Sequence, residues 1–329
     1  MKKVTVVIPN WNGMKYLELC LDSLRNQDTD DFEVIVVDNA STDGSVSYIR
    51  ERYPEVRLIV NSENLGFSGG VNTGIEACSS EFVLLLNNDV ECDARFVSAL
   101  TRAIEKDARI FSVNPKMVNY RDRNLLDDCG DLYTVIGWQA QRGAAQSVND
   151  PAYSKPAKVF SCCAGASIYR RKVFEEIGLF DTMHFAYLED IDVGYRAMLY
   201  GYHNLYEPSA VVYHVGSGSS GAVKYSDFKV RISARNAVYV AYKNMPVIQR
   251  MLNAFPMYIG RKLKQAFFRK LGFEQAYLDG VKEGFETRNM TKKVPRGTAG
   301  FFRCLYIEGL LIRNTFVYLH EYRKRHLKK

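Results

Sequence analysis

The sequence lacks the long apolar runs that cross a membrane. In its 329 residues there is no stretch of about 18 apolar residues without a charge, whereas a spanning helix needs about 20. The segment after Met1 carries two lysines but reaches Pro9 after a short apolar run, which is too short for a secretion signal. We therefore expect a chain that acts in the cytoplasm, either in solution or at a membrane surface.

Cysteine is also scarce, and its spacing excludes two classes of small structural site. The number of cysteines is odd and no pair has C-x-x-C spacing, so the sequence indicates neither a disulfide framework nor a zinc site. A reducing compartment such as the cytoplasm suits these residues. They are Cys20, Cys78, Cys92, Cys129, Cys162, Cys163 and Cys304.

The charge is divided unevenly along the chain. The composition, 47% hydrophobic and 25% charged residues, is that of a globular protein. Residues 243–329 contain 19 Lys and Arg against 6 Asp and Glu, a net charge of +13, whereas residues 1–242 contain 25 against 31, a net charge of −6. The two parts are therefore expected to have different partners.

Short β-branched or apolar runs alternate with helical patterns in the first hundred residues. Successive strand–helix units predict right-handed crossovers and a mainly parallel sheet, the α/β class. After the first run, for example, Leu17, Leu21 and Leu24 recur at helical spacing. The four predicted strands are Val4–Ile8, Phe32–Val37, Val56–Val60 and Phe82–Leu86.

Polar residues follow these strands directly, and in open α/β sheets ligands bind at the carboxyl ends of the strands. Asn87, Asn88 and Asp89 end the fourth run. A carboxylate with amide neighbours suits a hard divalent cation, although Asn and Asp also cap simple turns. Gly66–Gly74 follows the third run, where it could be a turn or contact a phosphate, but it does not match G-x-G-x-x-G.

A second group of polar residues lies further along the chain. Glu189, Asp190 and Asp192 occur at a predicted helix start, where negative charge complements the helix dipole. A carboxylate among aromatic groups such as Tyr187 can instead serve as a general base, because desolvation raises its pKa. His214 follows a predicted strand and precedes a Gly/Ser loop, so it is a candidate metal ligand or phosphate contact.

These motifs together resemble family 2 glycosyltransferases with the GT-A fold, and among them rhamnosyltransferase-like members. The resemblance covers about residues 4–245, so we expect a catalytic domain at 1–245 with a mixed, mostly parallel sheet flanked by helices, and a helical extension at 246–329. The motifs, in order, are Val6–Gly13, Val36–Gly44, Asn64–Gly74, Leu86–Val90, Gly178–Asp181, Glu189–Asp192 and His214–Gly218.

The resemblance implies an inverting enzyme that moves a sugar, such as rhamnose, from a dTDP-, UDP- or GDP-linked donor to a hydroxyl of a saccharide or lipid-linked acceptor in surface polysaccharide synthesis. Asp190 would be the base, with Glu189 beside it. Asp89 would hold Mg²⁺ or Mn²⁺ with help from His214, because Asn87 replaces the first acid of the family's metal motif. The residues expected to contact the donor are Pro9, Asn12, Asp38, Asn64, Asn72 and Asn88.

Two other functions stay open at this point. A nucleotidyltransferase also uses an α/β sheet and a metal carboxylate, but it would carry a Gly-rich basic loop after the first strand, where this chain has Pro9–Gly13. A nucleotide-sugar-binding protein without activity is the other alternative, and Asn87 favours it. The presence of Asp89, Asp190 and His214 together favours an enzyme.

The basic C-terminal part predicts amphipathic helices. Ile259, Leu263, Phe267 and Leu271 recur every four residues within a run rich in Lys and Arg. Such helices are typical of a membrane surface, here the cytoplasmic face, and an oligomer contact or packing on the catalytic domain are the alternatives. Phe301–Leu319 is interrupted by charges and should not span a membrane. No nucleic-acid-binding motif accompanies the charge.

Overall fold

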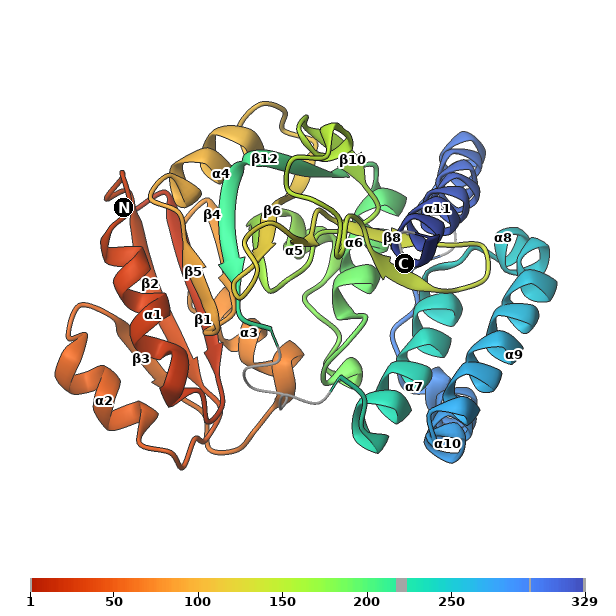
Figure 1. Cartoon of the computed structure of the whole chain (residues 1–329), viewed down its shortest axis with the longest axis horizontal. Helices are drawn as coiled ribbons and strands as arrows, with labels where there is room; N and C mark the ends of the chain where they lie inside the picture. The colour runs from red at the N-terminus through yellow and green to blue at the C-terminus, as the bar shows by residue number, and fades with distance from the viewer. Residues whose placement is uncertain (1, 217–223, 296, 328–329) are drawn as a thin grey trace.

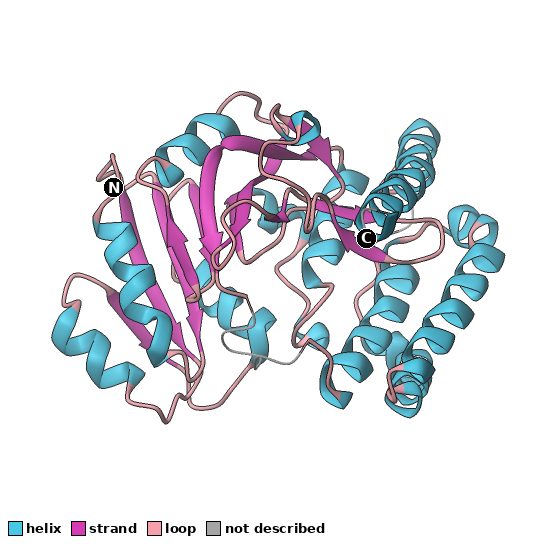
Figure 2. Ribbon diagram, viewed as in Figure 1, coloured by secondary structure: helices cyan, strands magenta, loops and turns pink. Residues whose placement is uncertain are grey.

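A mixed sheet forms the centre of the molecule (Figures 1 and 2). The structure is a computed structural model, and it describes residues 2–216, 224–295 and 297–327. The strand order along the sheet is β10-β12-β6-β11-β4-β1-β2-β3, with β5 (Val90–Cys92) paired to β12 and β7 (Leu126–Asp128) paired to β6. The other strands are β1 (Val4–Asn10), β2 (Phe32–Asp38), β3 (Arg57–Val60), β4 (Phe82–Leu86), β6 (Ile110–Asn119), β10 (Ala157–Val159), β11 (Ala166–Arg170) and β12 (His203–His214).

Strands β1 to β4 pair in parallel, as their sequences predict, and β11 joins them to the second half of the sheet in antiparallel orientation. Strand β4 is buried on both faces. Phe82, Leu84 and Leu86 contribute to one core, and Val83 and Leu85 to the other. Helices α1 (Met14–Arg25), α2 (Ser45–Arg52) and α4 (Phe96–Ile104) cover the first face, and α3 (Gly66–Glu76), α5 (Val173–Ile177) and α6 (Glu189–Tyr200) cover the second.

The structure differs from the sequence-based expectation in two places. The glycine-rich segment, which could have been a turn, forms helix α3 from Gly66 onward, and the Gly66 N–H donates to the side chain of Asn64 at 2.9 Å. Strand β6 was not predicted, since Pro115 interrupts its apolar run and the pairing with β12 is shifted between Glu207 and Val211. Trp138 lies in a hairpin formed by β8 (Asp131–Tyr133) and β9 (Gln139–Gln141), which is separate from the central sheet.

The last third of the chain is helical and gathers at one end of the sheet (Figure 1). The predicted amphipathic helix is α9, and it packs into a core shared with the preceding domain: Tyr195 of α6 lies in one cluster with Met257 of α9 and Ile307 of α11. In the described residues, no helix combines the length and apolarity needed to cross a bilayer. The helices are α7 (Asp227–Asn244), α8 (Val247–Leu252), α9 (Ala254–Lys270), α10 (Glu274–Thr287) and α11 (Phe301–Leu327), with short 3-10 helices at Pro151–Tyr153, Thr182–His184 and Arg288–Met290.

Candidate active site

The carboxyl ends of β1, β2 and β4 meet at one edge of the sheet. After β1 the chain continues to β2 on one side of it, whereas β4 pairs with the other side of β1. The loops that leave β1 and β4 therefore diverge, and in open α/β sheets this switch point is where ligands bind.

Asn10, the last residue of β1, connects the three strand ends. Its Nδ2 donates to Asp38 Oδ2 at 2.7 Å, and its Oδ1 accepts from Asn88 Nδ2 at 2.7 Å. The other carboxylate oxygen of Asp38 accepts from the Ser41 N–H at 2.8 Å. All these side chains except Ser41 are buried. A methyl group on Gly13 would lie 1.9 Å from Asn88 Nδ2, so only glycine leaves room for this network.

The other residues predicted to contact the donor also shape the backbone around this edge. Pro9 lies in β1 opposite Val37 of β2. Asn12 adopts a positive φ of 49° and accepts from the Thr42 N–H at 2.8 Å. Asn64 caps α3. Asn72 binds both backbone groups of Phe180, at 2.7 and 3.0 Å, which ties α3 to the loop before η2 (Thr182–His184).

The glycine-rich segment is the start of α3 and is tightly packed. Gly66 has φ 71°, and a methyl group there would lie 2.5 Å from the ring of Phe185. The Ser68 N–H donates to the carbonyl of Phe185 at 3.1 Å. Close packing thus explains Gly66, and the phosphate contact inferred from spacing stays a prediction.

Asp89 and His214 come together beyond β4 and β12, as the sequence predicted for two metal ligands. His214 Nε2 lies 3.4 Å from Asp89 Oδ1, and its Nδ1 lies 2.7 Å from Asp127 Oδ2. Burial alone would lower the pKa of His214, but the hydrogen bonds and charges of Asp127 and Asp89 outweigh it and raise the pKa to about 10. Asp127 and Asp89 therefore favour the protonated imidazole, and a cation that binds Nε2 would have to displace its proton.

The geometry at Asp89 and His214 fits a divalent cation that is shared with another ligand. Two ligands about 2.1 Å from one ion and at right angles lie about 3 Å apart, close to the observed 3.4 Å. The carboxylate of Asp127 on the other ring nitrogen is the usual partner of a metal-binding histidine. Within the described ranges, no group of three or more His, Cys, Asp and Glu side chains is spaced to hold an ion unaided, so further oxygens would have to come from the ligand.

Asp190 and Glu189 begin α6 and differ in charge. Burial raises the pKa of Asp190 to about 6, against a hydrogen bond from the Ile191 N–H at 2.7 Å that favours the carboxylate. Burial, and then the charge of Asp190, raise the pKa of Glu189 to about 8. At neutral pH Asp190 is ionised and can accept a proton, whereas Glu189 keeps its own proton. This difference between the two pKa values makes Asp190 the base of the pair and Glu189 its neutral member.

Two further carboxylates lie near Asp190. Burial, followed by the charge of Asp190, holds the pKa of Asp131 well above its usual range. Burial raises the pKa of Asp128 to about 7, and the charges of Asp127 and Asp190 add to this effect. Asp128 follows Asp127, which binds His214, so this segment joins the neighbourhood of Asp190 to that of Asp89.

The loop before Asp190 is held in an unfavourable backbone conformation. Phe185, Tyr187 and Leu188 all have positive φ, between 61° and 69°, and each such residue costs on the order of 1–3 kcal/mol. Asn236 of α7 donates to the carbonyls of residues 184, 186 and 187 at 2.7–2.9 Å, and Arg235 donates to those of residues 183 and 184. Helix α7 therefore sets the position of Asp190.

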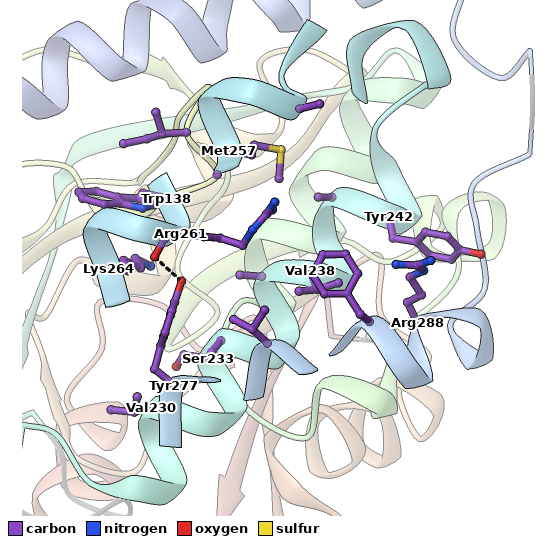
Figure 3. Close-up of a pocket in the computed structure, with 18 of the residues that line it drawn as sticks. Trp138, Val230, Ser233, Val238, Tyr242, Met257, Arg261, Lys264, Tyr277 and Arg288 are labelled. Atoms are coloured by element: carbon purple, nitrogen blue, oxygen red, sulfur yellow. Dashed lines mark hydrogen bonds between the residues drawn. The ribbon is translucent and has the colours of Figure 1, made fainter. Parts of the chain in front are cut away.

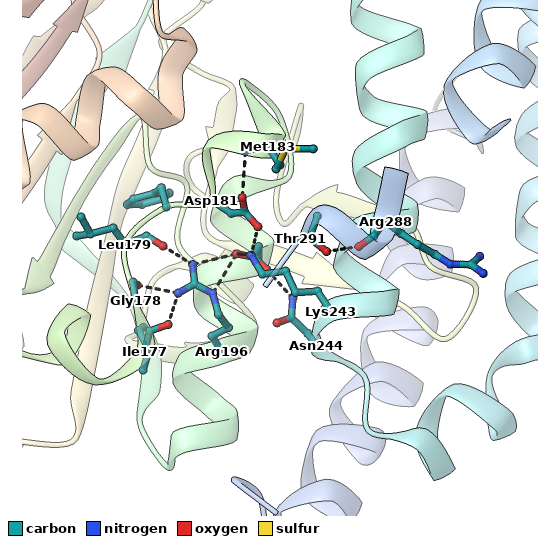
Figure 4. Close-up of polar contacts among 12 residues, drawn as sticks. Ile177, Gly178, Leu179, Asp181, Met183, Arg196, Lys243, Asn244, Arg288 and Thr291 are labelled. Carbon is teal, nitrogen blue, oxygen red and sulfur yellow. Dashed lines mark hydrogen bonds and ion pairs between the residues drawn. The ribbon is translucent and has the colours of Figure 1, made fainter. Parts of the chain in front are cut away.

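Asp192, the third carboxylate of the predicted motif, is structural, and Figure 4 labels the Arg196, Lys243 and Asn244 side chains that bind it. Its Oδ2 contacts Arg196 Nη2 at 2.9 Å and Lys243 Nζ at 3.0 Å, and its Oδ1 accepts from Asn244 Nδ2 at 2.8 Å. Burial would raise the pKa of Asp192, but the charges of Arg196 and Lys243 outweigh it and hold the pKa far below its usual range. Arg196 also binds carbonyls of residues 177–179, so α6, α7 and this loop are joined.

Sequence reasoning missed three residues of this site. Asn10 lies in a quoted motif and could have been chosen as the last polar residue of a strand. Asp127 lies in an irregular segment with no local pattern. Asn236 follows Arg235 in a helix far along the chain, where only a buried amide among apolar neighbours would have indicated a role.

Comparisons with known sequences show which proteins the chain resembles. A sequence model of the family described as Glycosyl transferase family 2 matches residues 5–178. The N-acetylglucosaminyl-diphospho-decaprenol L-rhamnosyltransferase of Mycobacterium tuberculosis is 27% identical over 237 residues, which are 66% of this chain and 77% of that protein. The GalNAc(5)-diNAcBac-PP-undecaprenol beta-1,3-glucosyltransferase of Campylobacter jejuni is 33% identical over 95 residues, 28% of this chain and 31% of that protein.

Solved structures share the fold. GalNAc-T7, crystallised with UDP, GalNAc and Mn²⁺, matches with a TM-score of 0.57 and 17% identity over 72% of this chain, which spans only 48% of that one. The mannosyltransferase PcManGT from Pyrobaculum calidifontis, in complex with GDP-Man and Mn²⁺, matches with a TM-score of 0.52 and 17% identity over 99% of this chain and 88% of that one. The GT-A fold predicted from the sequence is confirmed.

Proposed function

The chain belongs to glycosyl transferase family 2, and from this premise we propose that it is an inverting enzyme that transfers a sugar from a nucleotide-diphosphate donor to a hydroxyl of a lipid-linked saccharide. Rhamnose is the sugar we propose, because the relative from Mycobacterium tuberculosis is named as a rhamnosyltransferase that acts on a diphospho-decaprenol acceptor. Synthesis of a cell-surface polysaccharide is the proposed context.

One observation carries the proposal: Asp190 lies next to the buried Glu189 at the start of α6, in a loop that α7 holds in place. A single displacement with inversion needs one base, which removes the proton of the attacking hydroxyl. Asp190, with a pKa of about 6, is ionised at neutral pH and retains enough basicity for that transfer. Glu189, which is protonated, can donate a hydrogen bond to the acceptor or to Asp190.

The donor would bind at the edge formed by β1, β2 and β4. Pro9, Asn12 and Asp38 lie where the first two strands end, and Asn64 and Asn72 border the neighbouring helix α3. Asn88 would help to orient the donor through Asn10. The buried hydrogen bonds among these side chains make the edge rigid before a ligand arrives, which lowers the entropic cost of binding.

Asp89 and His214 would hold a divalent cation, Mg²⁺ or Mn²⁺, jointly with the donor diphosphate. The Mn²⁺ named with two structures of the same fold supports this part of the proposal. The bound ion would neutralise charge on the leaving diphosphate. Asp127 keeps the imidazole of His214 in one orientation through its hydrogen bond to Nδ1. Asn87 directs its amide toward Gly165, so we assign it no ligand role.

The helical extension, residues 246–329, would contact the cytoplasmic face of the membrane. Apolar side chains of α8, α9 and α11 are unusually exposed, among them Ile248 at 71%, Phe255 at 72% and Phe302 at 84%. Lys and Arg residues lie between them in the sequence, and each would contribute about 1 kcal/mol to binding at an anionic leaflet. Fractionation of cells at low and high salt tests this part: protein found only in the cytosol at low salt would refute it, and a homo-oligomer covering the same face would then be the better account.

The transfer reaction is tested with purified protein, Mn²⁺ and dTDP-, UDP- or GDP-linked sugars. We expect one donor to raise the unfolding temperature by mass action, and the wild type to hydrolyse it slowly and to transfer its sugar to a lipid-linked acceptor. Asp190→Asn should bind the same donor without transferring the sugar. Donor binding without turnover in either protein would favour a nucleotide-sugar-binding protein, and release of diphosphate from a nucleoside triphosphate and a sugar phosphate would favour a nucleotidyltransferase.

A further inference from the structure

A cavity of about 390 Å³ lies among the C-terminal helices (Figure 3), and none of the carboxylates of the candidate active site lines it. Its walls come from α7, α9, α10 and the hairpin formed by β8 and β9. Most of its lining is apolar, with Val230 and Val238 from α7, Met257 from α9 and Phe285 from α10. Its volume is within the range of about 300–1,000 Å³ that is usual for small-molecule sites.

Four cations line this apolar cavity: Arg250, Arg261, Lys264 and Arg288. No Asp or Glu lines it, and within the described part of the chain none of the four forms an ion pair. They lie against aromatic rings instead: Lys264 Nζ is 5.7 Å from the ring centre of Trp138, and the guanidinium of Arg288 is 5.1 Å from that of Phe285. Arg288 Nε is buried without a hydrogen-bond partner.

Some basic side chains outside the cavity, on the same helices, have acidic partners. Arg269 pairs with Glu274 at 2.6 Å, and Arg231 pairs with Glu283 at 2.8 Å. Acidic residues are thus available on α10 but are directed away from the cavity. Burial lowers the pKa of Lys264 to about 8, as expected for a cation that lacks a counter-ion. Four like charges around a largely apolar space are costly unless an anion joins them.

The chemistry of the lining defines the class of ligand. Arginine recognises phosphate and carboxylate through paired N–H donors, and lysine adds a point charge. Four cations exceed what a single carboxylate would neutralise, whereas a diphosphate ester carries two to three negative charges. The apolar walls suit an alkyl or isoprenoid chain. We propose that the cavity binds the diphosphate and the adjoining part of the lipid chain of the acceptor, an inference that rests on the proposed function.

The position of the cavity supports this occupant. One face of α7 lines the cavity through Val238, while Asn236 on another face holds the loop that precedes Asp190. The hairpin contributes Trp138 to the cavity and Asp131 to the group near Asp190. A ligand in the cavity would therefore touch the elements that frame the acceptor side, and a longer chain could continue over the exposed apolar side chains of α8 and α9.

Farnesyl diphosphate is a suitable probe for the full-length chain, and its binding is measured by calorimetry without donor. We expect it to bind at least about tenfold more tightly than pyrophosphate or farnesol alone, because each half makes only part of the contacts. Arg261→Gln with Lys264→Gln should weaken binding about tenfold or more, as expected for lost charge-assisted contacts. Lys262→Gln, an exposed neighbour on α9 that does not line the cavity, is the matched control and should bind as the wild type.

A variant that fills the cavity shows whether binding needs the space itself and not only the positive charges around it. Ala237→Phe places a ring in the cavity without changing its charge, and it should also weaken binding of farnesyl diphosphate. Thermal unfolding without ligand shows whether each variant is folded. Equal binding in folded variants and wild type, or pyrophosphate binding as tightly as farnesyl diphosphate, would overturn the proposal.

Two further arms separate this proposal from its alternatives. Vesicles of phosphatidylcholine with phosphatidylglycerol test whether the cavity binds a bilayer lipid instead. If the protein binds these vesicles but not farnesyl diphosphate, and the cavity variants abolish vesicle binding, the cavity is a bilayer-lipid site and our inference is wrong. The probe is tested without donor, so its binding does not depend on sugar transfer. If the protein binds farnesyl diphosphate but transfers no sugar, the proposed function is wrong, whereas the assignment of a lipid diphosphate to the cavity stands. A chain that transfers sugar but binds the probe equally well in all folded variants refutes only the cavity.

Discussion

Replacement of Asp190 by asparagine should make the protein more stable and inactive. Burial raises the pKa of Asp190 to about 6, whereas an unfolded chain gives about 3.9. The folded state therefore disfavours the ionised form. The shift of about two units corresponds to about 3 kcal/mol, which destabilises the fold above pH 6 and disappears as the pH falls below 4. Asparagine removes this cost and can still accept the Ile191 N–H through its Oδ1.

The prediction is measured by thermal unfolding and by sugar transfer at several pH values. In domains of 150–250 residues each kcal/mol corresponds to about 2–4 °C, so we expect Asp190→Asn to unfold several degrees higher than the wild type at about pH 7.5, with a smaller difference at about pH 5. Transfer should fall by about 10²–10⁴-fold, as for the loss of a general base. In the wild type, kcat/KM should fall about tenfold per unit below pH 6.

Glu189→Gln is the matched control. Burial raises the pKa of Glu189 to about 8, so the folded protein keeps a proton that an unfolded chain loses above about pH 4.3. The neutral amide should therefore also stabilise the protein from about pH 5 upward, with the full gain reached near pH 8, but it should retain more sugar transfer than Asp190→Asn because Asp190 still supplies the base. An Asp190→Asn protein that unfolds at or below the wild-type temperature at about pH 7.5, or that transfers sugar at a rate within tenfold of the wild type, would show that our account of this carboxylate is wrong.

Three other substitutions test the remaining parts of the site. Asp192→Asn leaves Arg196 without its buried carboxylate and Lys243 with Asp181 alone, so the free energy of unfolding should fall by about 3–5 kcal/mol; a change below 1 kcal/mol in denaturant melts would contradict this. Gly13→Ala would displace the Asn88 side chain, so the KM for the donor should rise while the unfolding temperature changes less; an unchanged KM would argue against a role for that network. Asp127→Asn should weaken Mn²⁺ binding about 10–100-fold, as for other groups that orient a metal-binding histidine, and equal affinity in calorimetry would exclude this role.

The sheet edge could be predicted because its pattern is local. Runs such as Phe82–Leu86 are apolar throughout, as a strand buried on both faces requires, and the polar residues that follow them mark the ligand edge. The roles of the individual side chains could not be predicted in this way. Asp38 appears in the sequence as a carboxylate at a strand end, but in the folded protein both of its oxygens accept hydrogen bonds from residues 10 and 41.

The C-terminal helices show a second limit of prediction from the sequence. The spacing of Ile259, Leu263 and Phe267 correctly predicts a helix with a separate apolar face, and these side chains are exposed. Met257, which packs inward, is apolar like the residues on the outer face. A helix with apolar side chains on two faces can bury either one, and the choice depends on the shape of the surface that it meets. Here Gly260 allows close contact with the backbone of Ile136.

The position of the proposed base depends on residues that no local pattern connects to it. Phe185, Tyr187 and Leu188 have bulky side chains, which disfavour a positive φ. The isolated segment would therefore adopt another conformation. The three carbonyls that accept from Asn236 make the observed conformation the one in which these buried groups are satisfied. Asn236 lies about 50 residues after the loop in the chain. Since the energy that holds Asp190 in place comes from this contact, the sequence around Asp190 can indicate a base but not its geometry.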